Sequence, residues 1–260
     1  MRKGCFEMKN VKSILVVMLV ALMLVSTLAG CGVDKEYEYN TEVISLENAP
    51  KEGDADIEAI TGYAEDSKQE LLELPYAIGD TGLEITSIGK YTGLYTDNGE
   101  NTEVTDILGL VVKNTSDKVV SYSSIQFEYA KDKQCTFNAT NLPSQQSVLL
   151  FTSVEPVQYD DVKKLELIDS MAVPADSLPM VEGVGVDCKD GEFIVTNHNK
   201  EDVGDVYIIF KNTIDGNVYL GGITYSVEVF DLKGYETRKV PAENFDAEKS
   251  VIVAVQNYEN

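Results

Sequence analysis

The 260-residue chain contains no tryptophan and a single histidine, His198. Tryptophan offers the largest flat apolar surface for stacking on a sugar ring, so its absence counts against a carbohydrate-active site. A lone histidine in the polar stretch TNHNKED lacks the partners of a metal site or a catalytic triad. The sequence also lacks a Walker loop, an HExxH zinc motif and a GxSxG nucleophile motif. These absences predict no catalytic, cofactor-binding or metal-binding residues, and they favour a protein that is not an enzyme.

Basic residues are also scarce. The chain has 21 lysines and arginines against 44 acidic residues, a formal net charge of −23. The electric field of such a chain repels nucleic acid and anionic lipid headgroups, and no basic patch offsets it. We therefore expect no nucleic-acid partner. Scattered carboxylates of this kind more often keep a surface soluble than collect cations.

The apolar run Ile14–Val25 is too short for a membrane span of about 20 residues, and it follows four basic residues. This arrangement is typical of a signal peptide. The run ends in Leu-Ala-Gly-Cys31, which resembles the lipobox of bacterial lipoproteins. The resemblance implies that residues 1–30 are removed and that the Cys31 thiol carries a diacylglyceryl group. Two acyl chains satisfy the requirement for stable anchoring, so we expect a protein lipid-anchored to the cell membrane on its extracytoplasmic face.

Removal of residues 1–30 leaves 17 basic and 43 acidic residues, a formal net charge of −26. Residues 31–80 are rich in acids and show no sustained apolar period. We interpret them as an acidic, flexible tether with at most a short helix between residues 54 and 74.

From Leu83 onward, short runs of β-branched and aromatic residues alternate with turn residues, which predicts an all-β sandwich fold. The run ILGLVV (107–112) is continuously apolar, as in a strand buried on both faces. The run IQFEY (125–129) alternates, as in a strand with one wet face. The same order recurs in VYIIF (206–210) and ITYSVEV (223–229).

Lys-Asn-Thr follows both buried runs, at 113–115 and again at 211–213, an offset of 98 residues. A period near 100 residues fits a duplicated sandwich domain rather than a solenoid. The alternative is that two unrelated strands converged on common turn residues. We expect a structural role for both tripeptides: the two asparagines end strands, and Lys113 and Lys211 point to solvent. The functional alternative is that the two Lys-Asn-Thr turns together form a ligand-binding surface.

The stretch VEVFD (227–231) and, less completely, FEYAK (127–131) resemble the FxLYD-type immunoglobulin-like domain of Gram-positive surface lipoproteins. The resemblance implies two tandem immunoglobulin-like β-sandwich domains in the cell envelope, and it carries over no catalytic residue. We place the domains at 81–172 and 180–260, on either side of the proline-bearing stretch 172–179. We expect each domain to fold alone.

The polar stretch 91–103 is the candidate binding loop of the first domain, although it lacks the spacing of an EF-hand and also fits an ordinary solvated loop. Its candidate residues are Tyr91, Tyr95, Asp97, Asn98, Glu100 and Asn101. Cys135 and Cys188 lie in different domains, and the sequence leaves open whether they are bridged. We interpret the chain as a non-enzymatic module that binds or scaffolds a protein or an envelope polymer. The alternative is a carboxylate-dependent hydrolase or a carbohydrate-binding protein at the cell surface.

Overall fold

The computed structural model describes residues 48–65, 71–97, 99 and 101–257. The predicted signal peptide, Cys31, Asn98 and Glu100 lie outside the described residues. The described chain is almost entirely β-structure, which confirms the all-β expectation. Its strands are β1 (Tyr63–Glu65), β2 (Tyr76–Ala77), β3 (Leu83–Tyr95), β4 (Thr102–Asn114), β5 (Val119–Ala130), β6 (Lys133–Leu142), β7 (Ser147–Leu150), β8 (Glu166–Ala175), β9 (Val184–Lys189), β10 (Glu192–Asn197), β11 (Gly204–Ile214), β12 (Val218–Leu232), β13 (Thr237–Pro241) and β14 (Ser250–Asn257). Two single 3₁₀ turns, η2 (Ile57–Ala59) and η3 (Tyr159–Asp161), accompany them.

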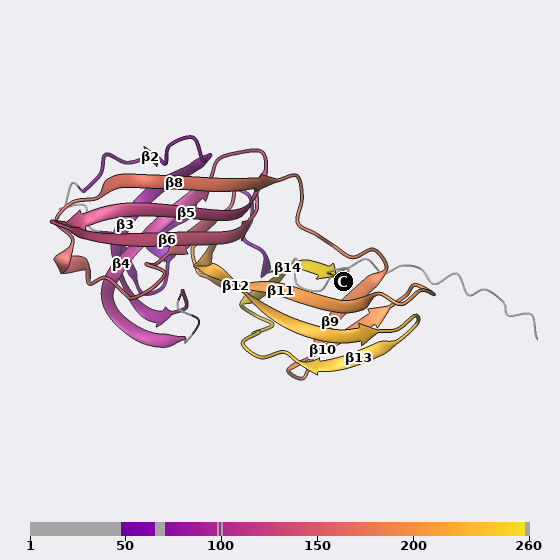
Figure 1. The fold of residues 1–260 in the computed structure, drawn as a ribbon. Helices are drawn as coiled ribbons and strands as arrows, with labels where there is room; N and C mark the ends of the chain where they lie inside the picture. Colours follow the sequence, from indigo (N-terminus) through magenta and orange to yellow (C-terminus); the bar gives the residue numbers. More distant parts are fainter. Residues whose placement is uncertain (1–47, 66–70, 98, 100, 258–260) are drawn as a thin grey trace, which may run out of the picture. The chain divides into compact units, whose positions relative to one another are not determined.

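Strands β3 to β8 form the first repeat, which has two layers (Figure 1). One layer has the order β3-β4-β7 and the other the order β6-β5-β8. The run 107–112 in β4 is buried on both faces, as its continuous apolar character predicted. The alternating residues Ile125 and Phe127 of β5 point into the core between the layers, where Phe127 packs edge-on against Phe137.

Strands β9 to β14 form the second repeat, with the layers β9-β10-β13 and β12-β11-β14. Each strand occupies the position of the strand six places earlier, so the order of the first repeat recurs strand for strand. Phe193, Phe210 and Phe245 meet in its core. The strand order of the first repeat therefore recurs in the second.

The register of this duplication differs from the predicted one. β4 ends at Asn114, and its counterpart β10 ends at Asn197, an offset of 83 residues. Both side chains are fully buried, and each Nδ2 donates to a carbonyl four residues further on, in Lys118 and Glu201. Each Oδ1 accepts an N–H from two residues further on. The offset of 98 was wrong, because the second Lys-Asn-Thr lies inside β11, whose counterpart is β5. Asn212 pairs within β11 and does not end a strand, contrary to our expectation.

The two repeats share a sheet. β7 of the first repeat pairs in parallel with β12 of the second, which gives the strand order β1-β3-β4-β7-β12-β11-β14. The pairing covers two strand edges that would otherwise be exposed. As a result β11 is buried on both faces: Ile208 and Phe210 face the second core, while Tyr207 and Ile209 pack against the first. The sequence had led us to expect two separate domains with few contacts between them, joined by the proline-bearing stretch 172–179.

The stretch 172–179 is also only partly a connector. β8 pairs with β5 as far as Ala175, so its strand extends beyond the boundary expected at 172.

The turn between β11 and β12 contains three residues, Asp215 to Asn217, with positive φ at Gly216 and Asn217. Positive φ is what a glycine or asparagine at a hairpin turn accommodates.

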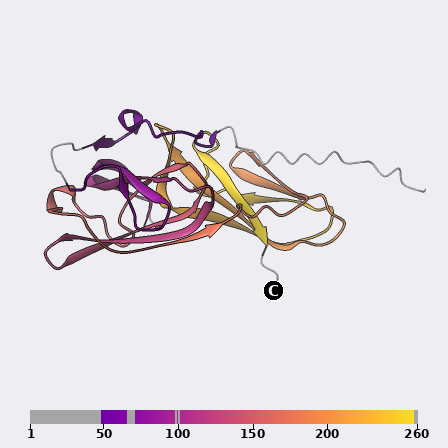
Figure 2. The ribbon, with the colours of Figure 1, turned by 90° about the horizontal axis from the view of Figure 1, so that it is seen from above.

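Residues 54–65 cover the outer face of the β3-β4-β7 layer (Figure 2). Ile60 and Tyr63 are buried there in a third apolar cluster with Tyr91, Phe151 and others, and β1 pairs with β3. A flexible tether as far as residue 80 is therefore wrong for this stretch. Ile57, Ile60 and Tyr63 lie three residues apart, a spacing that suggested a weak helix. Their burial against the sheet, rather than helix formation, stabilises this stretch. η2 supplies a single helical turn.

Cys135 and Cys188 are both free thiols. Within the part of the chain that the structure describes, no helix has the length and apolar character needed to cross a membrane.

Candidate functional site

A groove of about 780 Å³ opens between the two repeats, and we call it the inter-repeat groove. The β3–β4 hairpin of the first repeat forms one wall, and the end of β11, the start of β12 and the loop between β13 and β14 form the other. Its volume lies in the range of ligand-binding clefts. The lining residues are Thr61, Tyr91, Thr92, Gly93, Leu94, Asn101, Asn212, Thr213, Ile214, Asp215, Leu220, Asn244, Phe245, Asp246, Glu248 and Lys249.

The groove combines an apolar lining with an acidic rim. Half-buried apolar side chains come from both repeats: Leu94, Ile214, Leu220 and Phe245. The exposed charged residues are three carboxylates and one lysine: Asp215, Asp246, Glu248 and Lys249. This arrangement can bind a ligand with apolar groups and positive charge, because burial of the first and attraction of the second act together.

Asn101 ties the two walls together. Its Nδ2 donates to Oδ1 of Asn244 at 3.3 Å, and its Oδ1 accepts from the Tyr225 hydroxyl at 2.5 Å. Burial raises the pKa of Tyr225, so its hydroxyl remains a donor at neutral pH. The two walls therefore meet through side-chain hydrogen bonds as well as through the shared sheet.

The candidate loop is divided between the groove and the interior. Half-buried Asn101 and buried Tyr91 line the groove, while Tyr95 and Asp97 are buried and do not line it. Tyr95 packs against Phe151, and burial raises the pKa of Tyr95 to about 12. In its described part this stretch is therefore not an ordinary solvated loop.

Asp97 clamps the hairpin to both repeats. Its carboxylate accepts the N–H of Phe151 at 2.9 Å, of Gly222 at 2.6 Å and of Ile223 at 3.4 Å. Burial raises the pKa of this carboxyl to about 6, although the three N–H donors and the positive charge of Lys211 oppose that rise. A carboxylate held by backbone N–H groups from two repeats fixes their separation.

Lys211, expected to point to solvent, is instead fully buried. Its Nζ donates to the carbonyls of Thr140 at 3.1 Å, Gly222 at 3.1 Å and Ile223 at 2.8 Å. A β-bulge in β12 explains this burial. Phe210 pairs with Tyr225 and Asn212 pairs with Leu220, so the four residues 221–224 of β12 lie opposite Lys211 alone. The bulge turns their carbonyls toward the ammonium group, as bulges commonly re-aim groups.

Gly222 joins the two buried charges, because its N–H binds Asp97 and its carbonyl binds Lys211. A Cβ at this glycine would lie 1.7 Å from the Asn138 carbonyl oxygen, so no other residue fits. Burial lowers the pKa of Lys211 to about 7, whereas three carbonyl acceptors favour the ammonium form, the only one with three donors. We call this arrangement the Asp97–Gly222–Lys211 network. It links the hairpin of one groove wall to the strand of the other.

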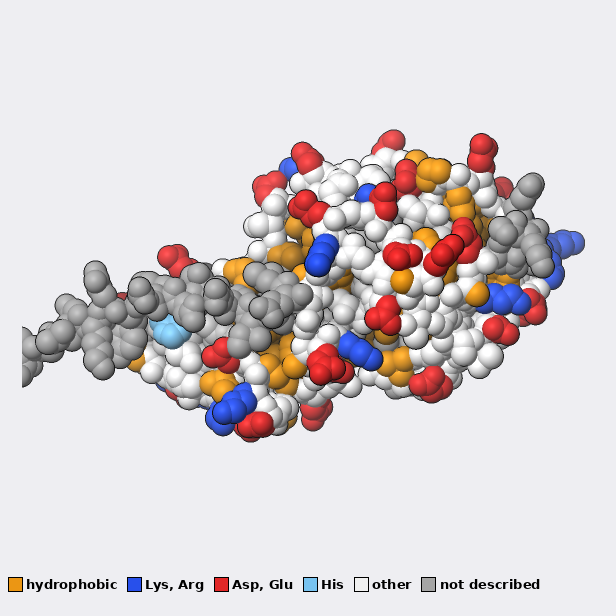
Figure 3. All heavy atoms as spheres, turned by 180° about the vertical axis from the view of Figure 1, so that it is seen from behind, with side chains coloured by type: hydrophobic (Ala, Val, Ile, Leu, Met, Phe, Trp, Pro, Cys, Tyr) orange, Lys and Arg blue, Asp and Glu red, His pale blue; other side chains and the backbone are white. Residues whose placement is uncertain are grey.

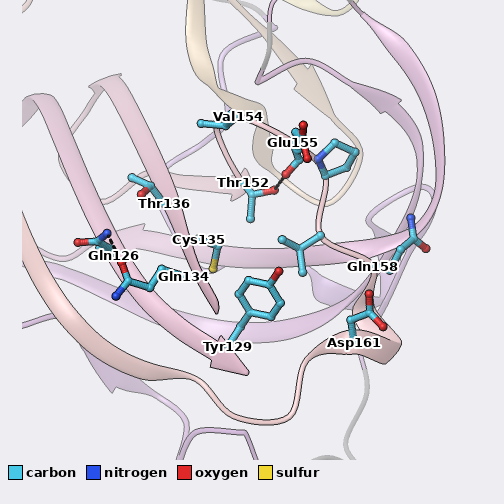
Figure 4. A pocket seen from close by; sticks show the side chains of 12 residues that line it. Gln126, Tyr129, Gln134, Cys135, Thr136, Thr152, Val154, Glu155, Gln158 and Asp161 are labelled. Atoms are coloured by element: carbon cyan, nitrogen blue, oxygen red, sulfur yellow. Dashed lines mark hydrogen bonds between the residues drawn. The ribbon is translucent and has the colours of Figure 1, made fainter. Parts of the chain in front are cut away.

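A second cavity, of about 430 Å³, lies within the first repeat beside the loop 152–161 (Figure 4). Tyr129 of β5 and Cys135 of β6 lie in its middle, and Glu155 and Asp161 of the loop lie at its sides. Burial raises the pKa of the Cys135 thiol to about 12. The reactive thiolate is thus disfavoured, and this cavity offers no activated nucleophile.

Acidic side chains are scattered over the face shown in Figure 3. Of the residues that the structure describes, no three His, Cys, Asp or Glu side chains are arranged to hold a metal ion. His198 lies half-buried after β10, and its backbone N–H donates to the Gly183 carbonyl.

No protein-family model, curated protein or solved structure matches this chain in our comparisons.

Sequence reasoning missed Lys211 and the wall formed by residues 244–249. One signal could have found the first: Gly221-Gly222 interrupts the strand pattern of β12, and glycine within a strand often marks a bulge or a close backbone approach. The loop between β13 and β14 carries no comparable signal, because its place opposite the β3–β4 hairpin depends on the pairing of β7 with β12.

Proposed function

We propose that this chain is a lipid-anchored cell-envelope protein that binds a partner protein or an envelope polymer in the inter-repeat groove and catalyses no reaction. The observation that carries the proposal is the groove itself, with apolar residues from both repeats under an acidic rim. The FxLYD resemblance and the lipobox ending at Cys31 support the cell-envelope location.

The fixed groove walls support binding rather than passive structure. The Asp97–Gly222–Lys211 network and the hydrogen bonds of Asn101 hold the walls before a ligand arrives. A site organised in advance loses less conformational entropy when it binds, which raises affinity. Burying Asp97 and Lys211 costs desolvation free energy, and this cost supports a role in holding the groove walls in one defined geometry.

The hydrolase alternative has less support. A general acid of the paired-carboxylate type needs a carboxyl in apolar surroundings that keep it protonated. The groove carboxylates Asp215, Asp246 and Glu248 are exposed, and Asp215 accepts a hydrogen bond from Thr61. Asp246 accepts the backbone N–H of Glu248, which makes it a turn-stabilising group.

The anchor is tested by replacing Cys31 with Ala. We expect the variant to leave the membrane fraction, because the thiol that would carry the lipid is gone, and to accumulate as precursor or in the medium. Cell fractionation with immunoblotting measures this, and Cys188→Ala serves as the matched control that keeps the anchor. Fractionation of the Cys31 variant with the wild type would contradict the anchor.

The groove is tested by placing a photoreactive amino acid at Thr92, an exposed lining residue, in intact cells. We expect an ultraviolet-dependent adduct at this position and none at Asp187, an exposed residue of β9 outside the groove. The adduct should weaken when Leu94→Ser is added, because this change removes apolar lining. Equal adducts at both positions, or an adduct insensitive to Leu94→Ser, would argue against the groove as the site.

A further inference from the structure

We propose that the inter-repeat groove takes an extended, positively charged segment of a partner protein in which apolar and basic side chains alternate. This inference rests on the proposed function and narrows it to one of the two partner classes left open above. Three features of the groove carry it: the sign of its rim, the position of its apolar residues and the charge of the whole chain.

The rim has three exposed carboxylates against a single lysine. Asp215 lies at the β11–β12 turn, whereas Asp246 and Glu248 lie in the loop between β13 and β14, so the negative charge comes from two separate elements of one wall. A cleft lined by charges of one sign raises the local concentration of a partner of the opposite sign and speeds its association. The rim therefore selects for lysine or arginine side chains.

The apolar lining comes from both walls. Leu94 belongs to the β3–β4 hairpin, while Leu220 and Phe245 belong to the second repeat. An extended segment directs successive side chains to opposite sides. One set of side chains can then enter the apolar lining while the other reaches the acidic rim, which is why we infer an alternating pattern.

The charge of the whole chain disfavours the other partner class. With a formal net charge of −23, the protein repels polyanionic polymers, and no basic group on the rim other than Lys249 offsets this. A polyanion would have to approach against both the long-range field and the local carboxylates. A cationic protein segment meets attraction at both ranges.

The test uses the mature chain, residues 31–260, with Cys31→Ser so that no detergent is needed. The probes are fluorescein-labelled hexapeptides that alternate Lys with Val, Ser with Val, or Glu with Val, and a neutral chito-oligosaccharide serves as a polymer probe. Fluorescence anisotropy measures each dissociation constant at low and high salt. We expect saturable binding of the Lys/Val peptide, at least about fivefold tighter than Ser/Val, weakened by salt.

Two variants connect this binding to the groove. Glu248→Lys reverses one rim charge and should weaken the Lys/Val peptide by about three- to tenfold, as expected for the loss of one exposed attraction and the gain of one repulsion. Leu94→Ser should weaken it as well. The matched control is Glu182→Lys, which makes the same charge change at an exposed position outside the groove and should have less than about a twofold effect.

The outcomes separate this inference from the proposed function. If Ser/Val, Glu/Val or the oligosaccharide binds as well as Lys/Val and Leu94→Ser weakens it, the groove remains the site and the cationic partner is wrong. If Glu182→Lys and Glu248→Lys weaken Lys/Val equally, the attraction is diffuse and the groove fails as the site. Absence of binding by the Lys/Val peptide overturns the inference, and the adduct at Thr92 then decides the groove independently.

Discussion

The two Lys-Asn-Thr segments have the same residues and different structures. In the first, Lys113 reaches outward to exposed Asp54, and Asn114 ends its strand as a buried hydrogen-bonding hub. In the second, Lys211 is fully buried and Asn212 is half-buried with a hydrogen bond from Ser250. The difference teaches that the environments of both the asparagine and the lysine depend on which strand the tripeptide joins, because Asn114 ends β4 whereas Asn212 pairs within β11.

The largest expected effect concerns the independence of the repeats. We expect fragment 48–176 to melt cooperatively below the temperature of the full chain, and fragment 177–260 to lack a cooperative melt. The second fragment exposes the apolar face of β11 and β14, which includes Ile209 and Val253 in the first core, and leaves Lys211 without the Thr140 carbonyl. This replaces the expectation of independent folding. Circular dichroism melts measure it, and two independent melts at the full-chain temperature would contradict it.

Replacing each lysine compares the two segments directly. Lys211→Ala should lower the free energy of unfolding by about 3–5 kcal/mol, because it leaves Asp97 as a buried charge without its positive neighbour and three carbonyls without a donor. Lys113→Ala should change it less, because the partner carboxylate, Asp54, is exposed to water and keeps its hydration when the lysine is removed. Urea unfolding measures both. Equal losses in the two variants would show that the buried network contributes nothing special.

Stability should depend on pH through Asp97. Its folded-state pKa is raised to about 6 from 3.8, so the stability it contributes is fully present below pH 3.8 and is lost as the pH rises through 6. The shift corresponds to about 3 kcal/mol. Lys211 acts oppositely, because its pKa is lowered to about 7 and stability rises from there toward pH 10.5. Urea unfolding between pH 3.5 and 7 measures the slope, and an unchanged slope in Asp97→Asn would contradict the assignment.

The smallest effect compares the asparagines. Asn114→Ala and Asn197→Ala should each cost about 2 kcal/mol, since each removes a fully buried amide and leaves buried or partly buried carbonyls without their donor. Asn212→Ala should cost less than about 1 kcal/mol, because this half-buried side chain accepts one hydrogen bond from Ser250. Thermal melts measure the three. A cost at Asn212 that matches the cost at Asn114 would contradict the difference between the two side-chain environments.

Much of the fold could be read from period-2 patterns. The alternation in 125–129 and the continuous apolar run 107–112 gave the correct strands with the correct faces, because each strand carries its own pattern. The candidate site was recovered only in part. Tyr91 and Asn101 line the groove, but Tyr91, Tyr95 and Asp97 are all buried, since polar residue types in a loop do not reveal whether another segment covers them.

The sequence by itself determined the all-β class and the acidic surface, because these depend on composition and on patterns over a few residues. Tertiary structure decided the burial of Lys211, whose ammonium group meets a carbonyl 71 residues away in Thr140. It also decided the groove, whose two walls belong to repeats joined by the pairing of β7 with β12 and by the hydrogen bonds of Asn101 and Asp97. Contacts at such separation depend on the packing of whole layers, and a strand pattern does not encode which neighbour it meets.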